Sequence, residues 1–373
     1  MRLLVILHES FGANGGIAKF NRDLLTALAA WPAVEALLVV QRDAPPNGTP
    51  LPEGLTLIAG GGKAGLLLAL LRCLLREGGF DLVLCGHLRL LPLAWLAQRR
   101  FRAPLAAVTH GIDAWQPTRH RLADRLVRRL DAVFGVSRLT LERLSAWSGL
   151  PPERGRLLPN TIDLDRFTPG PADPALAARL GVAGRRVVMT LGRLPAGGRD
   201  KGVEEMIAVL PRLLERHPDL VYLVAGDGPD RARLQARAEA KGVAGAVVFA
   251  GFVPEVEKAA LYRLADAFVL CGHSEGFGIV LLEAMASGVP VVASCRDGSR
   301  EAVRDGRLGL LADPEDPESL AAAVEVALAR PKGRPEGLED FAFPAFAARL
   351  QTLVAALVEM PPATGEPPET AAR

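Results

Sequence analysis

The sequence predicts an α/β protein of two doubly wound parallel-sheet domains that face a cleft. Three observations indicate this class. The chain has 373 residues, which is too long for one compact core and comfortable for two domains. Short apolar runs of strand length alternate with helical patterns nearly throughout. A stretch rich in Pro, Gly and Asp, from Pro159 to Pro174, interrupts this alternation and is the candidate linker.

Residues 1–165 are expected to form the first domain. A glycine loop follows the first apolar run, and a helix is expected from about Gly16 to Ala30. Further helices separate several of the later runs. The expected strands are Leu3–Leu7, Ala36–Val40, Thr56–Ile58, Leu82–Cys85, Leu105–Thr109 and Ala132–Val136. This βαβ rhythm is typical of a parallel sheet.

Residues 175–335 are expected to form the second domain, in which the same rhythm restarts. Its expected strands are Arg186–Leu191, Tyr222–Ala225, Val247–Ala250, Ala267–Leu270, Val289–Ala293 and Gly309–Ala312. Its expected helices lie near Val203–Arg216, Arg231–Lys241, Glu257–Leu264, Ile279–Ser287 and Pro317–Ala329. A last helix is expected at about 344–360, and residues 361–373 have the composition of a disordered tail. Both domains are expected to be Rossmann-like, with ligands beyond the carboxyl ends of the strands.

The composition is that of a globular protein, with 49% hydrophobic and 23% charged residues and a mean hydropathy of +0.20. The first apolar run is too short for a signal peptide, and charges or prolines break the others below the roughly 20 residues of a spanning helix. We therefore expect a soluble, cytoplasmic protein. The four cysteines lie far apart without a CxxC pair, so neither disulfides nor a zinc site are expected.

The net charge of +2 hides an uneven distribution. Residues 1–165 hold 20 Lys and Arg against 14 Asp and Glu, and much of the excess lies in 99–102 and 119–129. The second patch has the pattern of an amphipathic helix. It is either a solvated face or a surface that docks on anionic lipid or a phosphorylated acceptor, which would make the protein peripheral at the inner face of the membrane. No aromatic residues interleave with the arginines, so nucleic acid is not an expected partner.

The strongest functional motif is SEGFGIVLLEAMASG, residues 274–288. It follows an expected strand and leads into a helix, whose free N–H groups and positive dipole end favour phosphate. The glycines of the turn Gly276, Phe277 and Gly278 let the backbone approach a ligand closely. Glu283 lies eight residues after Glu275, and a carboxylate there can accept two ribose hydroxyls. The alternative makes Glu275 an N-cap-like acid and Glu283 a surface charge.

Two cations bracket a second motif, TLGRLPAGGRDKG. Arg193 follows the end of an expected strand, and Lys201 precedes the next helix. Two cations that converge from one loop can neutralise a diphosphate leaving group. The alternative is a pair of solvated loop charges.

Two weaker signals lie in the first half. Gly15 and Gly16 follow the first strand, but the sequence there has no GxGxxG dinucleotide fingerprint, so a plain turn is an equal alternative. His110 directly follows an expected strand and could donate to a transferring sugar; a purely structural histidine is the alternative.

These segments together resemble family 4 of the retaining glycosyltransferases, whose fold of two Rossmann-like domains is called GT-B. The resemblance covers nearly the whole chain and is carried by the glycine turn, the His110 strand end, the Arg193 and Lys201 pair, AGDGPDR, FAGFVP and the E-x7-E segment. The E-x7-E segment is the most specific of these. One departure is the sequence Asp297-Gly298-Ser299, where the family often has a glycine pair.

The resemblance implies roles for these residues. Arg193 and Lys201 would hold the donor diphosphate without a metal or other cofactor, Glu283 would bind the ribose, and Glu275 would lie beside the sugar. Gly15 and Gly16 would close over the phosphates, and the last helix would return to the first domain. Base recognition would come from the segment 252–258. The candidates within it are Val253 and Lys258.

The activity implied is transfer of a sugar from a nucleotide-diphosphate donor, UDP- or GDP-linked, to a glycan, glycolipid or small acceptor in bacterial envelope or glycoconjugate synthesis. The resemblance favours front-face substitution with retention, in which the departing diphosphate helps to take the acceptor's proton. The alternatives are a nucleotide-sugar epimerase and a non-catalytic partner subunit on the same fold. A glycoside hydrolase is disfavoured because the helical rise between Glu275 and Glu283, about 12 Å, exceeds the usual carboxyl separation of about 5–9.5 Å.

Overall fold

The computed structural model describes residues 1–197 and 201–359, and these residues divide into two compact units. Among the described residues, the first unit comprises 1–135, 140–158 and 347–359, and the second comprises Val136–Leu139 and Pro159–Phe346. The expected tail at 361–373 lies outside the described residues. Within the described part of the chain, no helix is long and apolar enough to cross a membrane.

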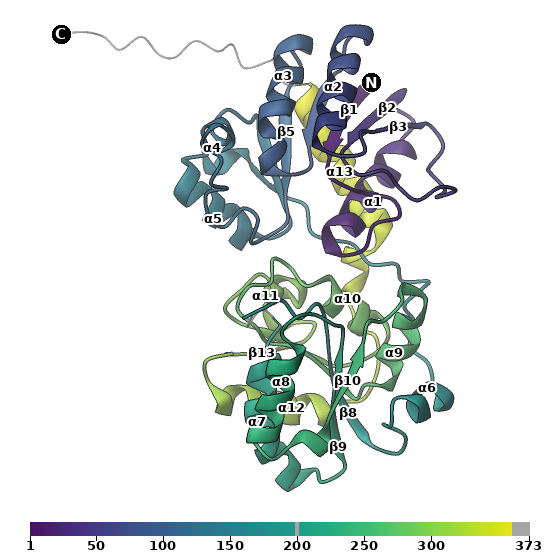
Figure 1. Ribbon diagram of the computed structural model, residues 1–373, viewed down its shortest axis with the longest axis vertical. Coiled ribbons are helices and arrows are strands. Elements are labelled where there is room, and N and C mark those ends of the chain that lie inside the picture. The colour runs from purple at the N-terminus through teal and green to yellow at the C-terminus, as the bar shows by residue number, and fades with distance from the viewer. Residues whose placement is uncertain (198–200, 360–373) are drawn as a thin grey trace, which may run out of the picture. The chain divides into compact units, whose positions relative to one another are not determined.

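The first unit is built on a parallel sheet of seven strands, in the order β3-β2-β1-β4-β5-β6-β7 (Figure 1). The strands are β1 (Arg2–Leu7), β2 (Ala36–Gln41), β3 (Leu55–Ala59), β4 (Leu82–Cys85), β5 (Leu105–Thr109), β6 (Ala132–Gly135) and β7 (Gly155–Leu157). The helices are α1 (Gly16–Ala29), α2 (Lys63–Arg76), α3 (Leu91–Phe101), α4 (Arg121–Val127), α5 (Arg138–Ser148) and α13 (Phe343–Val358), with short 3₁₀ turns at Leu88–Leu90 and Pro152–Arg154.

Six of these strands were predicted. The seventh, β7, escaped prediction because it is a three-residue edge strand that is only partly buried.

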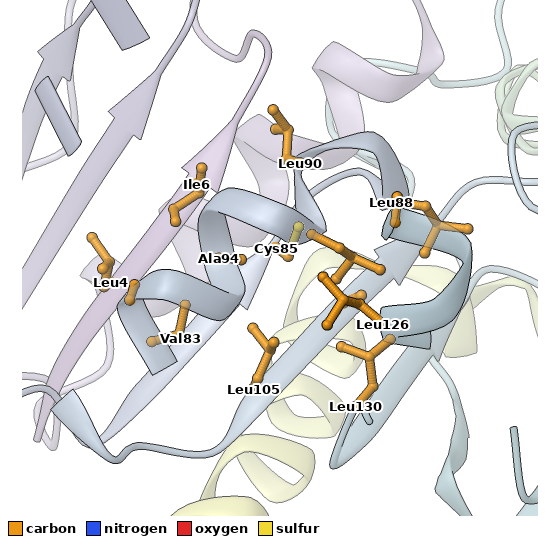
Figure 2. Close-up of a cluster of buried hydrophobic side chains, with 14 of the residues drawn as sticks. Leu4, Ile6, Val83, Cys85, Leu88, Leu90, Ala94, Leu105, Leu126 and Leu130 are labelled. Atoms are coloured by element: carbon orange, nitrogen blue, oxygen red, sulfur yellow. The ribbon is translucent and has the colours of Figure 1, made fainter. Parts of the chain in front are cut away.

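The sheet of the first unit is covered on both faces. Leu4 and Ile6 of β1 point into a core that α2, α3 and α4 complete, and Leu3 and Val5 on the opposite face are equally buried. Figure 2 shows the core on the side of Leu4 and Ile6. Side chains of β1, β4 and β5 there contact side chains of α3, of α4 and of the turn that follows α4. Burial on both faces explains why the strands are apolar throughout rather than alternating.

The basic patch at 119–129 forms a shorter helix than its pattern predicts. Helix α4 begins at Arg121 and ends at Val127, and His120 caps it by accepting a hydrogen bond from the backbone of Ala123. Arg119 precedes this cap with a positive φ of 64°, a conformation that stops the helix from extending toward the N-terminus.

The second unit has a parallel sheet of six strands in the order β10-β9-β8-β11-β12-β13. The strands are β8 (Arg186–Leu191), β9 (Leu220–Ala225), β10 (Val247–Gly251), β11 (Ala267–Leu270), β12 (Val291–Ser294) and β13 (Leu310–Ala312). The helices are α6 (Pro174–Arg179), α7 (Val203–Arg216), α8 (Arg231–Ala240), α9 (Lys258–Leu264), α10 (Ile279–Ala286), α11 (Ser299–Ala302) and α12 (Pro317–Ala329), with 3₁₀ turns at Ala244–Ala246, Glu255–Glu257, Arg304–Gly306 and Leu338–Phe341. The two sheets confirm the predicted fold class of paired Rossmann-like parallel-sheet domains.

The stretch from Pro159 to Pro174 is a packed part of the second unit rather than a free linker. Ile162 forms a parallel bridge with Ala342, and Phe167 is buried against the ring of Tyr262, 6.0 Å away between centroids. Helix α6 begins at its end, where Asp173 caps the backbone amides of the first turn. Proline and glycine here mark an irregular path, which side-chain burial still fixes in place.

Candidate functional site

Strand order locates the candidate site in the second unit. The sheet runs outward from β8 in one direction to β9 and β10 and in the other to β11, β12 and β13, so the order reverses between β8 and β11. At such a reversal, the loops that follow the two strands run to opposite sides of the sheet. This leaves room for a ligand at the carboxyl ends of the strands. The loop after β8 carries Arg193 and Lys201, and the loop after β11 carries Glu275. The two strongest sequence motifs therefore flank one reversal point.

Lys201 and Glu275 form an ion pair, with 2.5 Å between Nζ and Oε2. Both side chains are mostly buried, at 25% and 18% exposure. The side chain of Lys201 also lies against Gly192, where an added Cβ would come within 3.0 Å of its Cε. The lysine therefore folds back along the loop toward Arg193, the residue after Gly192. This arrangement excludes the alternative of a solvated loop charge for Lys201.

Arg193 is exposed and, within the described part of the chain, makes no ion pair. Its loop is nevertheless anchored to the turn after β9, because Leu194 donates a backbone hydrogen bond to the carbonyl of Asp227, 3.0 Å away. Gly226 and Gly228 pack so closely here that a Cβ on either would meet the backbone of the Arg193 loop at about 2 Å. The glycines of AGDGPDR thus hold the base of the arginine loop.

The turn before α10 has the geometry expected of a phosphate site. Gly278, which has no side chain, is the N-cap of α10 with a φ of 89°, and among the described residues no side-chain cap bonds to the first amides of the helix. Phe277 is buried, with its ring centroid 5.7 Å from that of Phe341, and this packing holds the turn in place. Because the cap is Gly278 and Glu275 pairs with Lys201, the N-cap alternative for Glu275 is excluded.

Asp297 supports the same turn, a residue that sequence reasoning noted only as a departure from the family pattern. Its Oδ2 accepts a hydrogen bond from the backbone N–H of Glu275 at 2.9 Å, and its Oδ1 accepts one from the Ser299 hydroxyl at 2.6 Å. Gly298 returns a hydrogen bond from its N–H to the carbonyl of Glu275, 2.8 Å away. Burial raises the pKa of Asp297 to about 6. Its place after a strand end was the signal that could have identified it.

Glu283 lies inside the protein rather than on its surface, with 2% of its side chain exposed. Its Oε2 accepts a hydrogen bond from the Tyr262 hydroxyl at 2.7 Å, and its Oε1 lies 3.8 Å from Nζ of Lys258. Lys258 itself pairs with Glu255 at 2.5 Å. These contacts fix the orientation of the Glu283 carboxylate. Its burial excludes the alternative in which Glu283 is a surface charge. Val253, the other candidate for base recognition, is half-buried in the same segment.

The first unit brings three histidines to the carboxyl ends of its strands. His8 follows β1, His87 follows β4 and His110 follows β5, and the strand order reverses between β1 and β4. The rings of His8 and His87 are 4.9 Å apart, edge to face. Burial lowers the pKa values of His87 and His110 to about 4, so both imidazoles are neutral at pH 7. Sequence reasoning identified only His110, although His8 and His87 occupy the same kind of position.

His110 is held by its surroundings. Its backbone N–H donates to Asp113 at 3.0 Å, and its Nε2 lies 3.3 Å from the carbonyl of Gly86. The ring packs edge to face on Phe20 of α1, with centroids 5.1 Å apart. Burial raises the pKa of Asp113 to about 6, and its Oδ2 has no hydrogen-bond partner among the described residues. The neutral imidazole of His110 is a group that can exchange hydrogen bonds with hydroxyls.

The glycine turn of the first unit lies at the start of α1. Gly15 is the N-cap, with φ 107° and ψ 169°, and no side chain in the described part of the protein caps the helix. Gly15 and Gly16 are both exposed. An added Cβ at Gly15 would meet nothing within 4 Å, so backbone conformation rather than space requires glycine there.

Family models match both units. Residues 177–339 match the model described as glycosyl transferases group 1, and residues 14–166 match that described as glycosyltransferase family 4. The GDP-mannose-dependent alpha-(1-6)-phosphatidylinositol monomannoside mannosyltransferase of Mycolicibacterium smegmatis is 35% identical over 278 residues, which are 69% of this chain and 72% of that protein. The chain belongs to the group 1 glycosyl transferases, of the family 4 type.

Other matches agree with this group 1 glycosyl transferase assignment. The D-inositol 3-phosphate glycosyltransferase of Geodermatophilus obscurus is 34% identical over 272 residues, covering 68% of this chain and 60% of that protein. The crystal structure of Anabaena HepE in complex with UDP-glucose superposes with a TM-score of 0.73 at 22% identity, covering 96% of this chain and all of that one. The structural likeness shows the GT-B fold. This group 1 enzyme is accordingly a nucleotide-sugar glycosyltransferase.

Proposed function

We propose that this enzyme transfers a sugar from a UDP- or GDP-linked donor to a hydroxyl of a glycan, glycolipid or small acceptor, with retention of configuration and without a metal ion. The observation that carries the proposal is the ion pair of Lys201 with Glu275 beside the uncapped N-terminus of α10. Lys201, Arg193 and the helix amides supply the positive charge that a departing diphosphate requires. That supply serves the purpose a divalent cation has at other phosphate sites.

In the proposed step, the bond between the anomeric carbon and the β-phosphate oxygen breaks, and its electron pair leaves with the nucleoside diphosphate. The acceptor oxygen bonds to the same face of the sugar, and its proton passes to an oxygen of the departing diphosphate. Glu275 and His110 orient the sugar, and no protein side chain acts as nucleophile. The neutral imidazole of His110 suits a hydrogen-bonding role rather than that of a cation.

The remaining predicted residues complete the proposed donor site. Glu283 holds the ribose, with Tyr262 and Lys258 fixing its orientation. The turn at Gly276, Phe277 and Gly278 receives phosphate oxygens on its backbone amides. Val253 and Lys258 border the base. In the first unit, Gly15 and Gly16 contribute exposed backbone to the phosphates.

The two curated relatives suggest which substrates to test first. The name of one specifies GDP-mannose as its donor, and both names specify acceptors that contain inositol. We therefore propose GDP-mannose as the first donor and an inositol-bearing lipid or inositol phosphate as the first acceptor. Such a product belongs to bacterial envelope or glycoconjugate synthesis.

Donor binding is tested with UDP, GDP, ADP and their sugar conjugates in EDTA, by calorimetry on the wild type and on Arg193→Ala/Lys201→Ala. We expect one nucleotide to bind and the double variant to lose at least about tenfold in affinity, since each charge-assisted contact contributes about 1.5–3 kcal/mol. Lys241→Ala/Arg307→Ala removes two exposed cations of the same unit and should bind normally. Binding that requires magnesium, or that survives in the Arg193 and Lys201 variant, would refute the proposed site.

Retention is tested separately on the product. With an α-linked donor, the newly formed glycosidic bond should show the α-anomeric coupling in NMR spectra. A β-linked product would exclude the front-face mechanism while leaving the donor site intact.

A further inference from the structure

Helix α2 is apolar on two sides. Leu66, Leu70 and Cys73 are buried in the core of the first unit, yet Leu67 and Leu71 on the other side are exposed, as are two more leucines of the helix. Leu75 is 82% exposed and Leu68 is 48% exposed. A helix on the surface of a globular domain usually turns polar residues outward, and contiguous exposed apolar area marks an interaction surface.

These leucines share one face. Positions four apart in a helix lie above one another, so Leu67, Leu71 and Leu75 form a row, and Leu68 stands beside it. Six of the eleven large exposed hydrophobic side chains among the described residues lie on α2, α3 and α4. The other two helices contribute Leu96 and Leu122.

The charged residues within α2 and α3 are all positive, and Glu77, directly after α2, pairs with Arg2. Helices α2 and α3 contain no Asp or Glu. Their cations are all exposed, namely Lys63, Arg72, Arg76, Arg99 and Arg100.

The two helices present this charge on one surface. They lie side by side on the same face of the sheet (Figure 1), and Arg100 of α3 donates to the carbonyl of Leu74 in α2, 3.0 Å away. We call the exposed side chains of α2 and α3 the leucine–arginine face.

We propose that the leucine–arginine face docks this enzyme on a bilayer surface containing anionic lipid, with the α2 leucines entering the interface and the arginines contacting lipid phosphates. Membrane docking deepens the proposed function, because a lipid-linked acceptor lies at a membrane surface. The docking proposal rests on the proposed function only through the choice of a lipid-linked acceptor. A cationic helix with apolar side chains on its outward face has the composition of an interfacial helix.

Charge decides between a bilayer and a second copy of the chain. In a two-fold dimer the same patch meets itself, so five cations would face five cations without a carboxylate from α2 or α3 between them. An anionic membrane instead attracts each cation near its surface by about 1 kcal/mol.

The test measures co-sedimentation of the full chain with vesicles of phosphatidylglycerol and phosphatidylcholine and with vesicles of phosphatidylcholine alone, at low and high salt. We expect binding to the anionic vesicles only, weakened by salt. Arg72→Gln/Arg76→Gln should bind about 25-fold more weakly, because each lost cation costs about fivefold. Leu68→Ser/Leu75→Ser should bind at least about tenfold more weakly.

Matched controls lie in the second unit. Val326→Ser changes a side chain that is 48% exposed, as Leu68 is, and Arg307→Gln removes an exposed cation; both should bind vesicles as the wild type does. Unchanged vesicle binding by the α2 variants, or a concentration-dependent dimer that these substitutions dissolve, would overturn the proposal.

Nucleotide binding without lipid is measured on every variant. It separates failure of the docking surface from failure of the donor site, and the circular dichroism spectrum and melting curve of each variant show that its first unit is folded.

Discussion

Glu283 is a carboxylate almost out of contact with water, and its neighbours determine what it can bind. One oxygen accepts the hydroxyl of Tyr262 and the other faces Lys258. When a buried carboxylate loses a hydrogen-bond donor, the free-energy cost of removing it from water remains, but the hydrogen bond that offset this cost is gone. The function of Glu283 therefore depends on Tyr262, which has no place of its own in the proposed nucleotide contacts, as well as on Lys258.

Replacing the hydroxyl of Tyr262 tests this dependence. Tyr262→Phe should lower the free energy of unfolding by about 2 kcal/mol and weaken nucleotide binding several-fold, because Glu283 loses its orienting donor. The chain offers a matched control in its only other tyrosine, Tyr222, whose buried hydroxyl bonds to Thr190 at 2.7 Å. Tyr222→Phe should cost about 1 kcal/mol of stability and leave the nucleotide affinity unchanged. Equal losses of affinity in both variants would contradict the role given to Tyr262.

His110 makes stability depend on pH. Burial lowers its pKa from 6.5 to about 4, so the unfolded chain takes up this proton first as the pH falls. The unfolding free energy should therefore decrease between about pH 6.5 and pH 4, by up to about 3 kcal/mol from this residue. Urea unfolding of the wild type and His110→Gln at several pH values measures the effect. The stability of the wild type relative to the variant should be constant above about pH 7 and should decrease as the pH falls from about 6.5 to 4. A relative stability that stays constant or increases over that fall in pH would refute the assignment.

At the scale of elements, the loops that carry Lys201 and Glu275 lie close together only because a glycine leaves room for the backbone of the neighbouring loop. Gly202 joins the Lys201 loop to α7 with a φ of 73°, and a Cβ there would lie 2.2 Å from the carbonyl oxygen of Cys271. The carbonyl belongs to the loop that carries Glu275. Close approach of these two backbones is what brings the lysine to the glutamate.

Gly202→Ala should therefore cost more than its backbone strain. We expect a loss of at least about 3 kcal/mol in unfolding free energy and a clear loss of nucleotide affinity, since the loops must separate. Gly184→Ala is the control, because Gly184 has nearly the same φ, 71°, with nothing within 4 Å of an added Cβ. It should cost only about 1 kcal/mol and bind nucleotide normally. Chemical denaturation and calorimetry on both variants decide the matter.

The same scale shows what the sequence could predict. Strands such as Arg186–Leu191 were found to the residue because each is a mostly apolar run between turn residues. Glu275 and Glu283 were found because one motif contains both. Asp297 and Tyr262 were missed, since each meets its glutamate only through folding, across 22 and 21 positions of sequence.

The sequence pattern also could not predict which side chains are buried and how deeply. Helix α2 reads as leucine-rich on every side, and only the packed structure separates the leucines that enter the core from those that face outward. Likewise, a histidine after a strand does not reveal how deeply its ring is buried, so the low pKa of His110 was not predictable.

At the scale of the whole molecule, the donor site and the histidine cluster belong to different sheets, each with its own core. A nucleotide that binds the second unit should stabilise that unit, by about 2.7 kcal/mol at a concentration of 100 times its Kd. Hydrogen exchange should therefore slow most in β8, β11 and α10, and hardly in β1 to β6. Arg193→Ala/Lys201→Ala should show no such slowing. Equal protection of both units in the wild type would contradict a donor site whose contacts lie mainly in the second unit.

The connectivity of the two units has a consequence for how the protein is made. Helix α13 lies late in the chain, after the whole second unit, but from Ala347 onward it groups with the first unit and buries Leu350 and Val354 completely. During synthesis the first unit must therefore wait, with the surface for this helix uncovered, while roughly two hundred further residues leave the ribosome, which takes about 10–40 seconds. Growing chains would expose that surface to chaperones, and the first unit would be finished last.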